Sequence, residues 1–127
     1  MKKFPLIIGV VTVLIVVGGV FWTSKSSTSP SKLYPLPSNL QYYWGDGCPH
    51  CKIVEDFLTS WDKKDKVVID KKEVWANAAN AKELEARYES CKITNPNEMG
   101  VPLLFTPDGK CYSGDTEIIN YLKNAEL

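Results

Sequence analysis

Residues 40–52, Leu-Gln-Tyr-Tyr-Trp-Gly-Asp-Gly-Cys-Pro-His-Cys-Lys, contain the feature that decides the fold: a strand-forming run, a turn and a Cys-x-x-Cys pair. The aromatic residues 42–44 favour a β-strand, and Gly45 and Gly47 permit a sharp turn. Pro49 suits the first position of a helix, where its missing N–H breaks no hydrogen bond. The stretch therefore predicts a strand that delivers both cysteines to the start of a helix.

The predicted helix places Cys48 at its N-terminus. Its apolar residues recur with the period of one helix face: Ile53, Val54, Phe57, Leu58 and Trp61. Free N–H groups and the positive end of the helix dipole favour a thiolate at the N-terminus, so we expect Cys48 to be the attacking thiol. Cys51 lies further into the helix, where we expect it to be more buried and to resolve the intermediate.

His50 stands between the two cysteines and is the only histidine in the sequence. A histidine at this position can add positive charge or a hydrogen bond to the Cys48 thiolate. The alternative is an exposed helix residue without effect on the chemistry. The candidate catalytic residues are therefore Cys48 and Cys51, with His50 in a supporting role.

The rest of the sequence predicts three further strands and two further helices. The runs 67–69, 101–105 and 110–113 are typical of short strands. A helix is expected over residues 76–91, and a last helix is expected to begin at Asp115, which would cap it. The order βαβαββα predicts an α/β fold with a mixed four-stranded sheet flanked by helices.

An uncharged apolar run of 19 residues, 4–22, lies near the start of the sequence. As a helix it would span roughly 28 Å, close to the bilayer core of about 30 Å, so we expect one transmembrane helix. Lys2 and Lys3 are expected to keep the N-terminus in the cytoplasm, which places the rest of the chain outside the cytoplasmic membrane. The alternative is a cleaved signal peptide, whose apolar region is shorter, about 7–15 residues.

The composition divides the chain into three parts. Residues 1–22 form the predicted membrane anchor, residues 23–37 are rich in Ser, Thr and Pro and indicate an extended tether, and residues 38–127 form the predicted domain. All 15 acidic residues lie at Asp46 or beyond, whereas four of the 15 basic residues precede the domain. The domain therefore carries 11 basic and 15 acidic residues, which argues against a nucleic-acid partner.

Together these motifs resemble the thioredoxin superfamily in its compact glutaredoxin-like form. The resemblance covers residues 40–123 and rests on the order of the elements, the Cys-Pro-His-Cys motif at 48–51, and Val101-Pro102 before a strand. It implies that Pro102 is a cis proline beside the dithiol and that the backbone of Val101 pairs with an extended substrate segment. The Pro-His dipeptide is similar to that of bacterial periplasmic disulfide oxidases, whose large inserted helical domain has no counterpart in this sequence.

The predicted function is membrane-anchored, extracytoplasmic thiol–disulfide exchange on protein thiols and disulfides, served by a membrane or soluble redox partner and without a cofactor. An oxidising compartment and His50 favour oxidation or isomerisation over reduction. One alternative is copper or zinc binding through Cys48, His50 and Cys51, although structural zinc needs four protein ligands; we predict no metal site. Another is a non-catalytic interaction module that carries the dithiol.

Cys91 and Cys111 are expected to form a second, structural disulfide. If the first two strands are parallel, the helix over 76–91 returns to the end of the sheet opposite the active site. The strand that starts at Pro102 runs to the same end, so Cys111 begins its return strand there. Such a bridge would close a loop of about 20 residues and stabilise the fold by roughly 3 kcal/mol. The alternative is two separate buried cysteines.

Overall fold

Four strands and three helices make up residues 34–127, the part of the chain that the computed structural model describes. In chain order they are β1 (Leu40–Trp44), α3 (Pro49–Ser60), β2 (Ile69–Glu73), α4 (Ala78–Ser90), β3 (Leu103–Phe105), β4 (Cys111–Ser113) and α5 (Asp115–Asn124). The predicted order and the α/β class are confirmed. The predicted membrane anchor and most of the predicted tether lie outside the described residues. None of the helices within 34–127 is long and apolar enough to span a bilayer.

The sheet is built around β1 and β3, its two inner strands. The strand order is β2-β1-β3-β4. β1 runs parallel to β2 and antiparallel to β3, and β3 and β4 form an antiparallel pair. In the middle of β1, Tyr42 pairs with Lys71 on one side and with Leu104 on the other. The predicted mixed four-stranded sheet is therefore confirmed.

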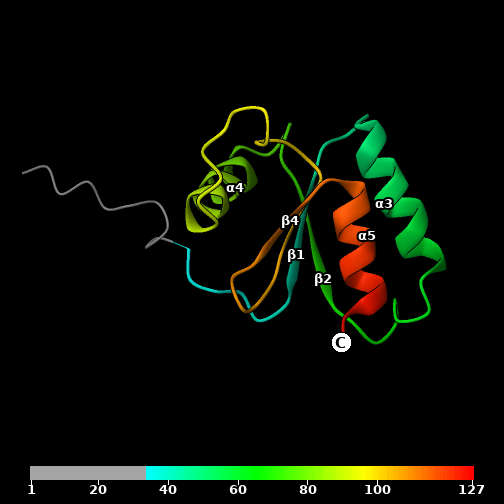
Figure 1. Ribbon diagram of the computed structural model, residues 1–127. Coiled ribbons are helices and arrows are strands. Elements are labelled where there is room, and N and C mark those ends of the chain that lie inside the picture. Colours follow the sequence, from blue (N-terminus) through cyan, green and yellow to red (C-terminus); the bar gives the residue numbers. More distant parts are fainter. Residues whose placement is uncertain (1–33) are drawn as a thin grey trace, which may run out of the picture.

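Helices cover both faces of this sheet: α3 and α5 lie on one face and α4 lies on the other (Figure 1). Alternate residues of β1 point to opposite faces, as the pleat of a strand requires. Tyr42 packs on the α3 and α5 side with Leu40, Val54, Leu58, Trp61, Leu104, Ile118 and Leu122. Tyr43 packs on the α4 side with Val74, Leu84, Tyr88, Leu103 and Phe105. Ile53, predicted on the apolar face of α3, is instead 47% exposed.

The second strand lies later in the sequence than predicted. The sequence predicts a strand over the apolar run 67–69, but β2 spans Ile69–Glu73, with the sequence Ile-Asp-Lys-Lys-Glu. Val68 precedes the strand and is 61% exposed. The prediction is wrong because β2 is an edge strand with little apolar burial, so its hydrophobic pattern does not mark it.

Ion pairs with helices on both faces accommodate the charged residues of β2. Lys71 Nζ lies 2.6 Å from Glu55 Oε2 of α3, and Lys72 Nζ lies 2.8 Å from Glu83 Oε2 of α4. Adjacent strand residues point to opposite faces, which is why neighbouring lysines reach different helices. The charge pattern of β2 thus fits a strand placed between acidic residues of two helices.

One helix begins later than predicted, and another has a different cap. Asn77 caps α4 by accepting hydrogen bonds from two first-turn N–H groups at 3.1 Å each, so the helix begins at Ala78. The cap of α5 is Gly114, whose φ of 85° suits glycine. Asp115 is the first helical residue and not the cap; at that position its negative charge is favoured by the helix dipole.

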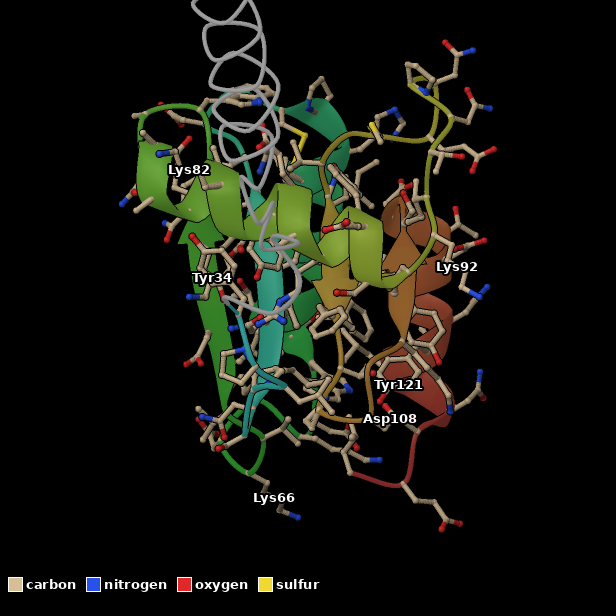
Figure 2. The ribbon with its side chains drawn as sticks, turned by 90° about the vertical axis from the view of Figure 1, so that its left-hand side faces the viewer. Tyr34, Lys66, Lys82, Lys92, Asp108 and Tyr121 are labelled. Carbon is tan, nitrogen blue, oxygen red and sulfur yellow. A yellow bond between two sulfur atoms is a disulfide. The ribbon has the colours of Figure 1, made fainter. Side chains whose placement is uncertain are left out.

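A disulfide joins Cys91, the C-cap of α4, to Cys111, the first residue of β4, with a Cα to Cα distance of 6.1 Å. These are the two cysteines that the topological argument paired. The path of the helix differs from that argument, because α4 crosses the strands and does not run back along them (Figure 2). The bridge therefore fastens the end of α4 to the edge strand β4.

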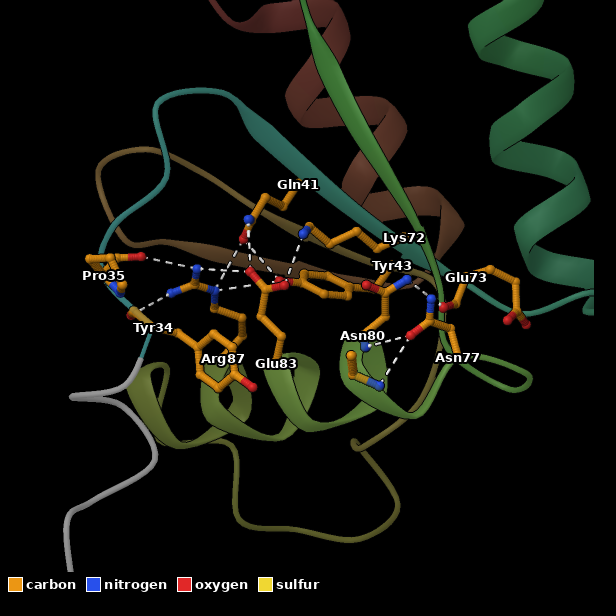
Figure 3. Close-up of polar contacts among 11 residues, drawn as sticks. Tyr34, Pro35, Gln41, Tyr43, Lys72, Glu73, Asn77, Asn80, Glu83 and Arg87 are labelled. Atoms are coloured by element: carbon orange, nitrogen blue, oxygen red, sulfur yellow. Dashed lines mark hydrogen bonds and ion pairs between the residues drawn. The ribbon is translucent and has the colours of Figure 1, made fainter.

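A buried arginine connects α4, β1 and the chain before β1. Arg87 is 2% exposed and donates hydrogen bonds to the carbonyl oxygens of Tyr34 and Pro35, at 3.1 Å each (Figure 3). It also donates to Gln41 Oε1 at 3.1 Å and lies 3.3 Å from a carboxylate oxygen of Glu83. The last residues of the predicted tether are thus held against the domain.

The acceptors around Arg87 are themselves hydrogen-bonded. Gln41 Nε2 donates to Glu83 Oε1 at 2.9 Å, and the Tyr43 hydroxyl donates to Gln41 Oε1 at 2.9 Å. Burial raises the pKa of the Glu83 carboxyl, but hydrogen bonds from Lys72 and Gln41 outweigh burial and hold that pKa below its usual range. Glu83 therefore stays ionised and compensates the buried charge of Arg87.

Arg87→Ala is expected to lower the free energy of unfolding by about 3–5 kcal/mol, because it leaves a buried carboxylate and several buried acceptors without their donor. Urea unfolding of the full-length chain, followed by circular dichroism, measures the loss. Lys82→Ala is the control, since Lys82 is an exposed residue of the same helix (Figure 2) and its removal should cost less than about 0.5 kcal/mol. Equal losses in the two variants would contradict the role given to Arg87.

Candidate active site

Cys48 and Cys51 lie at the junction of β1 and α3. Cys48 is the N-cap of α3, with an extended backbone (φ −74°, ψ 117°), and Pro49 is the first helical residue. The turn before it depends on Gly47, whose φ is 77°, and on a hydrogen bond of 3.2 Å from Cys48 N–H to the Gly45 carbonyl. The two cysteines form a disulfide with a Cα to Cα distance of 5.2 Å. The predicted strand, turn and helix are all present.

The helix N-terminus provides a hydrogen-bond donor to the sulfur of Cys48. Cys51 N–H donates to Cys48 Sγ at 3.1 Å, and the same sulfur lies 3.7 Å from the carbonyl oxygen of Val101. Once the disulfide is reduced, this N–H and the helix dipole favour negative charge on Cys48. Cys48 is 7% exposed and Cys51 is 2% exposed, so Cys48 is the more accessible thiol by a small margin.

Tyr42 fixes the first turn of α3 to the central strand. Its hydroxyl donates a hydrogen bond of 3.2 Å to the carbonyl oxygen of Cys51. Burial raises the pKa of the Tyr42 phenol well above its usual value, and the negative charge of Glu55 raises it further. The phenol therefore stays protonated and remains a donor beneath the dithiol.

Glu55, one helical turn after Cys51, belongs to the same site although no sequence motif marks it. Its Oε2 pairs with Lys71, whereas its Oε1 is buried and is the one such side-chain oxygen or nitrogen within 34–127 that lacks a hydrogen-bond partner. Glu55 lines a depression of about 300 Å³ together with Cys48 and Cys51. A carboxylate oxygen without a hydrogen-bond partner therefore lies in the same depression as the two cysteines.

His50 lies on the outer side of the first turn of α3. Its side chain is 69% exposed, and its Nδ1 lies 3.5 Å from Oδ2 of Asp115, at the start of α5. The imidazole therefore links the helix that carries the dithiol to α5. The structure keeps His50 beside the motif, where the sequence places it, and adds an acidic partner that sequence reasoning missed.

The Val101–Pro102 peptide bond is cis. Pro102 is buried, and its carbonyl oxygen accepts a hydrogen bond of 3.0 Å from Gly114 N–H. This bond holds the segment before β3 against the start of α5, while the pairing of β3 with β1 brings Val101 next to Cys48. A groove of about 560 Å³ opens on the same side and is lined by Val101, Pro102 and His50 among others. The dithiol thus lies between two depressions.

Glu73, at the end of β2, holds two loops beside the dithiol. Its carboxylate accepts backbone hydrogen bonds from Ala76 at 2.8 Å, Trp75 at 2.9 Å and Asp46 at 3.4 Å, and these bonds lower the pKa of Glu73. Trp75 is 62% exposed, and its indole lies against Gly45, where an added Cβ would be 2.4 Å from the ring. An exposed indole is therefore held in a fixed position beside the active-site turn.

The described residues contain no group of three or more His, Cys, Asp or Glu side chains that could hold a metal ion. No protein-family model, no curated protein and no solved structure matches the chain. Its chemistry must therefore be inferred from its own residues.

Iodoacetamide at neutral pH is expected to label Cys48 before Cys51 in the reduced protein. Cys48 Sγ accepts a hydrogen bond from Cys51 N–H and lies at the positive end of the helix dipole, and both favour the reactive thiolate. Cys48 is also the more exposed of the two cysteines. Mass spectrometry of peptides from a time course gives the two rates. Faster labelling of Cys51 would reverse the roles assigned to the two thiols.

Gly45→Ala is expected to displace Trp75, because the new methyl group would lie 2.4 Å from the indole. The loss of stability should be about 1–3 kcal/mol, as for other overpacked sites. Introducing Trp75→Ala into the same chain removes the clash, so the double variant should lose less than the sum of the two single variants. Denaturant unfolding of the four proteins completes the cycle, and additive losses would show that the indole does not pack on Gly45.

Proposed function

We propose that this protein is an enzyme of thiol–disulfide exchange that acts through Cys48 and Cys51. The observation that carries the proposal is the position of this disulfide-capable pair, with Cys48 at the N-cap of α3 and its sulfur accepting the Cys51 N–H at 3.1 Å. A cysteine at a helix N-terminus is stabilised as the thiolate, which is the species that exchanges with disulfides.

In the oxidising direction, a substrate thiolate attacks Cys48 Sγ, the Cys48–Cys51 bond breaks, and its electron pair leaves on Cys51 as a thiolate. A second substrate thiolate then attacks the substrate sulfur of the mixed disulfide and releases Cys48. Two substrate thiols become one disulfide, and the protein disulfide becomes a dithiol. Reduction of a substrate follows the same steps in reverse.

The finer assignment is a thioredoxin-like, glutaredoxin-sized oxidoreductase. The α/β architecture, the mixed sheet and the close cysteine pair are compatible with it. In this assignment the backbone of Val101, next to cis-Pro102, pairs with an extended substrate segment. His50 favours the Cys48 thiolate and so shifts the chemistry toward oxidation or isomerisation.

The proposed location is the outer side of the cytoplasmic membrane. It is supported by the uncharged run 4–22 and by the lysines before it, which indicate a single-pass anchor with the domain outside. The proposed partners are protein thiols and disulfides as substrates, together with a membrane or soluble protein that restores the redox state of the dithiol. The described residues contain no cluster that supports the metal-binding alternative.

Trapping with cysteine variants of the full-length chain tests the function. Cys51→Ser keeps the attacking thiol but loses the resolving one. Its reduced form should therefore accumulate a mixed disulfide with insulin, visible on a non-reducing gel. Cys48→Ser should form no such adduct, and both variants should lose turnover. Trapping by Cys48→Ser alone would reverse the roles. No turnover by the wild-type protein would favour an interaction module without catalysis, and unchanged turnover in both variants would show that the two cysteines do not carry the reaction.

A further inference from the structure

The groove of about 560 Å³ beside the dithiol is built from three parts of the chain. His50 comes from the first turn of α3, and Val101 and Pro102 form the wall nearest to Cys48. The remaining wall comes from the rest of the loop before β3, from β4 and from the start of α5. It comprises Ile93, Asn97, Glu98 and Gly100 of the loop, Cys111 and Ser113 of β4, and Gly114, Asp115 and Glu117 at the start of α5. The two active-site cysteines do not line the groove, but Val101, which does, lies 3.7 Å from Cys48 Sγ through its carbonyl oxygen, so a polypeptide that approaches Cys48 from the Val101 side passes along the groove.

Apart from His50, the ionisable side chains that line the groove are all carboxylic acids or cysteine. Three carboxylates, from Glu98, Asp115 and Glu117, line it, whereas its lining contains a single imidazole and no lysine or arginine. Neutral donors orient two of the carboxylates without cancelling their charge. The amide of Asn95 donates to Glu98 Oε1 at 3.1 Å, and Ser113 N–H donates to Glu117 Oε2 at 3.2 Å.

We propose that this groove selects polypeptide substrates with lysine or arginine next to the reactive cysteine and disfavours anionic thiols. This proposal rests on the proposed exchange function. A cationic side chain in the groove gains favourable interactions with Glu98 and Glu117, close to the point where its neighbouring sulfur meets Cys48. An anionic thiol, such as a peptide with glutamates beside its cysteine or the tripeptide glutathione, is repelled by the same carboxylates. The carboxylates therefore determine which disulfides react quickly.

Two synthetic peptide disulfides test the proposal, identical except that lysine or glutamate flanks the cysteine. The full-length chain is reduced, and its second-order rate constant with each peptide is measured. Each value is divided by the rate constant of dithiothreitol with the same peptide. This ratio removes the effect of the flanking charges on the intrinsic reactivity of the peptide disulfide. At low ionic strength the lysine peptide should react about tenfold faster by this measure. At about 1 M salt, where the Debye length is roughly 3 Å, the ratio should approach one.

The variant Glu98→Gln with Glu117→Gln should lose most of this preference, since it keeps both acceptors and removes both charges. The matched control is Asp62→Asn with Asp65→Asn, two exposed acidic residues after α3, which changes the net charge equally away from the groove. An equal loss of preference in both double variants, or none in either, would overturn the groove as the cause. If neither peptide reacts with the wild-type dithiol, the proposed exchange function fails as well.

Discussion

The antiparallel pairing of β1 with β3 is the constraint on which the active site depends. A short turn joins the end of β1 at Trp44 to the start of α3 at Pro49, so Cys48 lies just beyond the carboxyl end of this strand. β3 runs in the opposite direction, and its first residue, Leu103, pairs with Tyr43, so Pro102 lies at the same end of the sheet. If β3 ran parallel to β1, its first residue would lie a strand length away, about 10 Å for three residues. The contact between Cys48 and Val101 is thus a result of strand direction.

Each part of the site is held by a residue from another element. Tyr42 of β1 fixes the carbonyl of Cys51, and Gly114 before α5 fixes Pro102. Glu73 of β2 fixes the loop that contains Asp46 and the loop that contains Trp75. These supports do not involve the two sulfur atoms. The framework around the dithiol can therefore persist when the disulfide opens, which would keep the two sulfur atoms in position for the proposed exchange.

The sequence predicts the site best where the determinants are local. A strand, a glycine turn and a cysteine at a helix N-terminus are all encoded within residues 40–52, and the structure contains all three. β2 escapes prediction because its charged residues are matched by acids on helices that the sequence does not show to be adjacent. Arg87 looks like any charged helix residue, and its burial depends on carbonyls more than 50 positions earlier in the chain. Glu73 acts on backbone N–H groups, which leave no trace in the side-chain pattern.

The clamp that Arg87 places on Tyr34 and Pro35 has a mechanical consequence. A pulling force on the chain that precedes Tyr34 acts first on the hydrogen bonds between these two carbonyls and Arg87. Through the Arg87 guanidinium the force is transmitted to α4 and to the first half of β1. The turn that carries Cys48 lies beyond the opposite end of β1. A force on the chain before Tyr34 is therefore shared with α4 and the first half of β1 before it reaches the turn that carries Cys48.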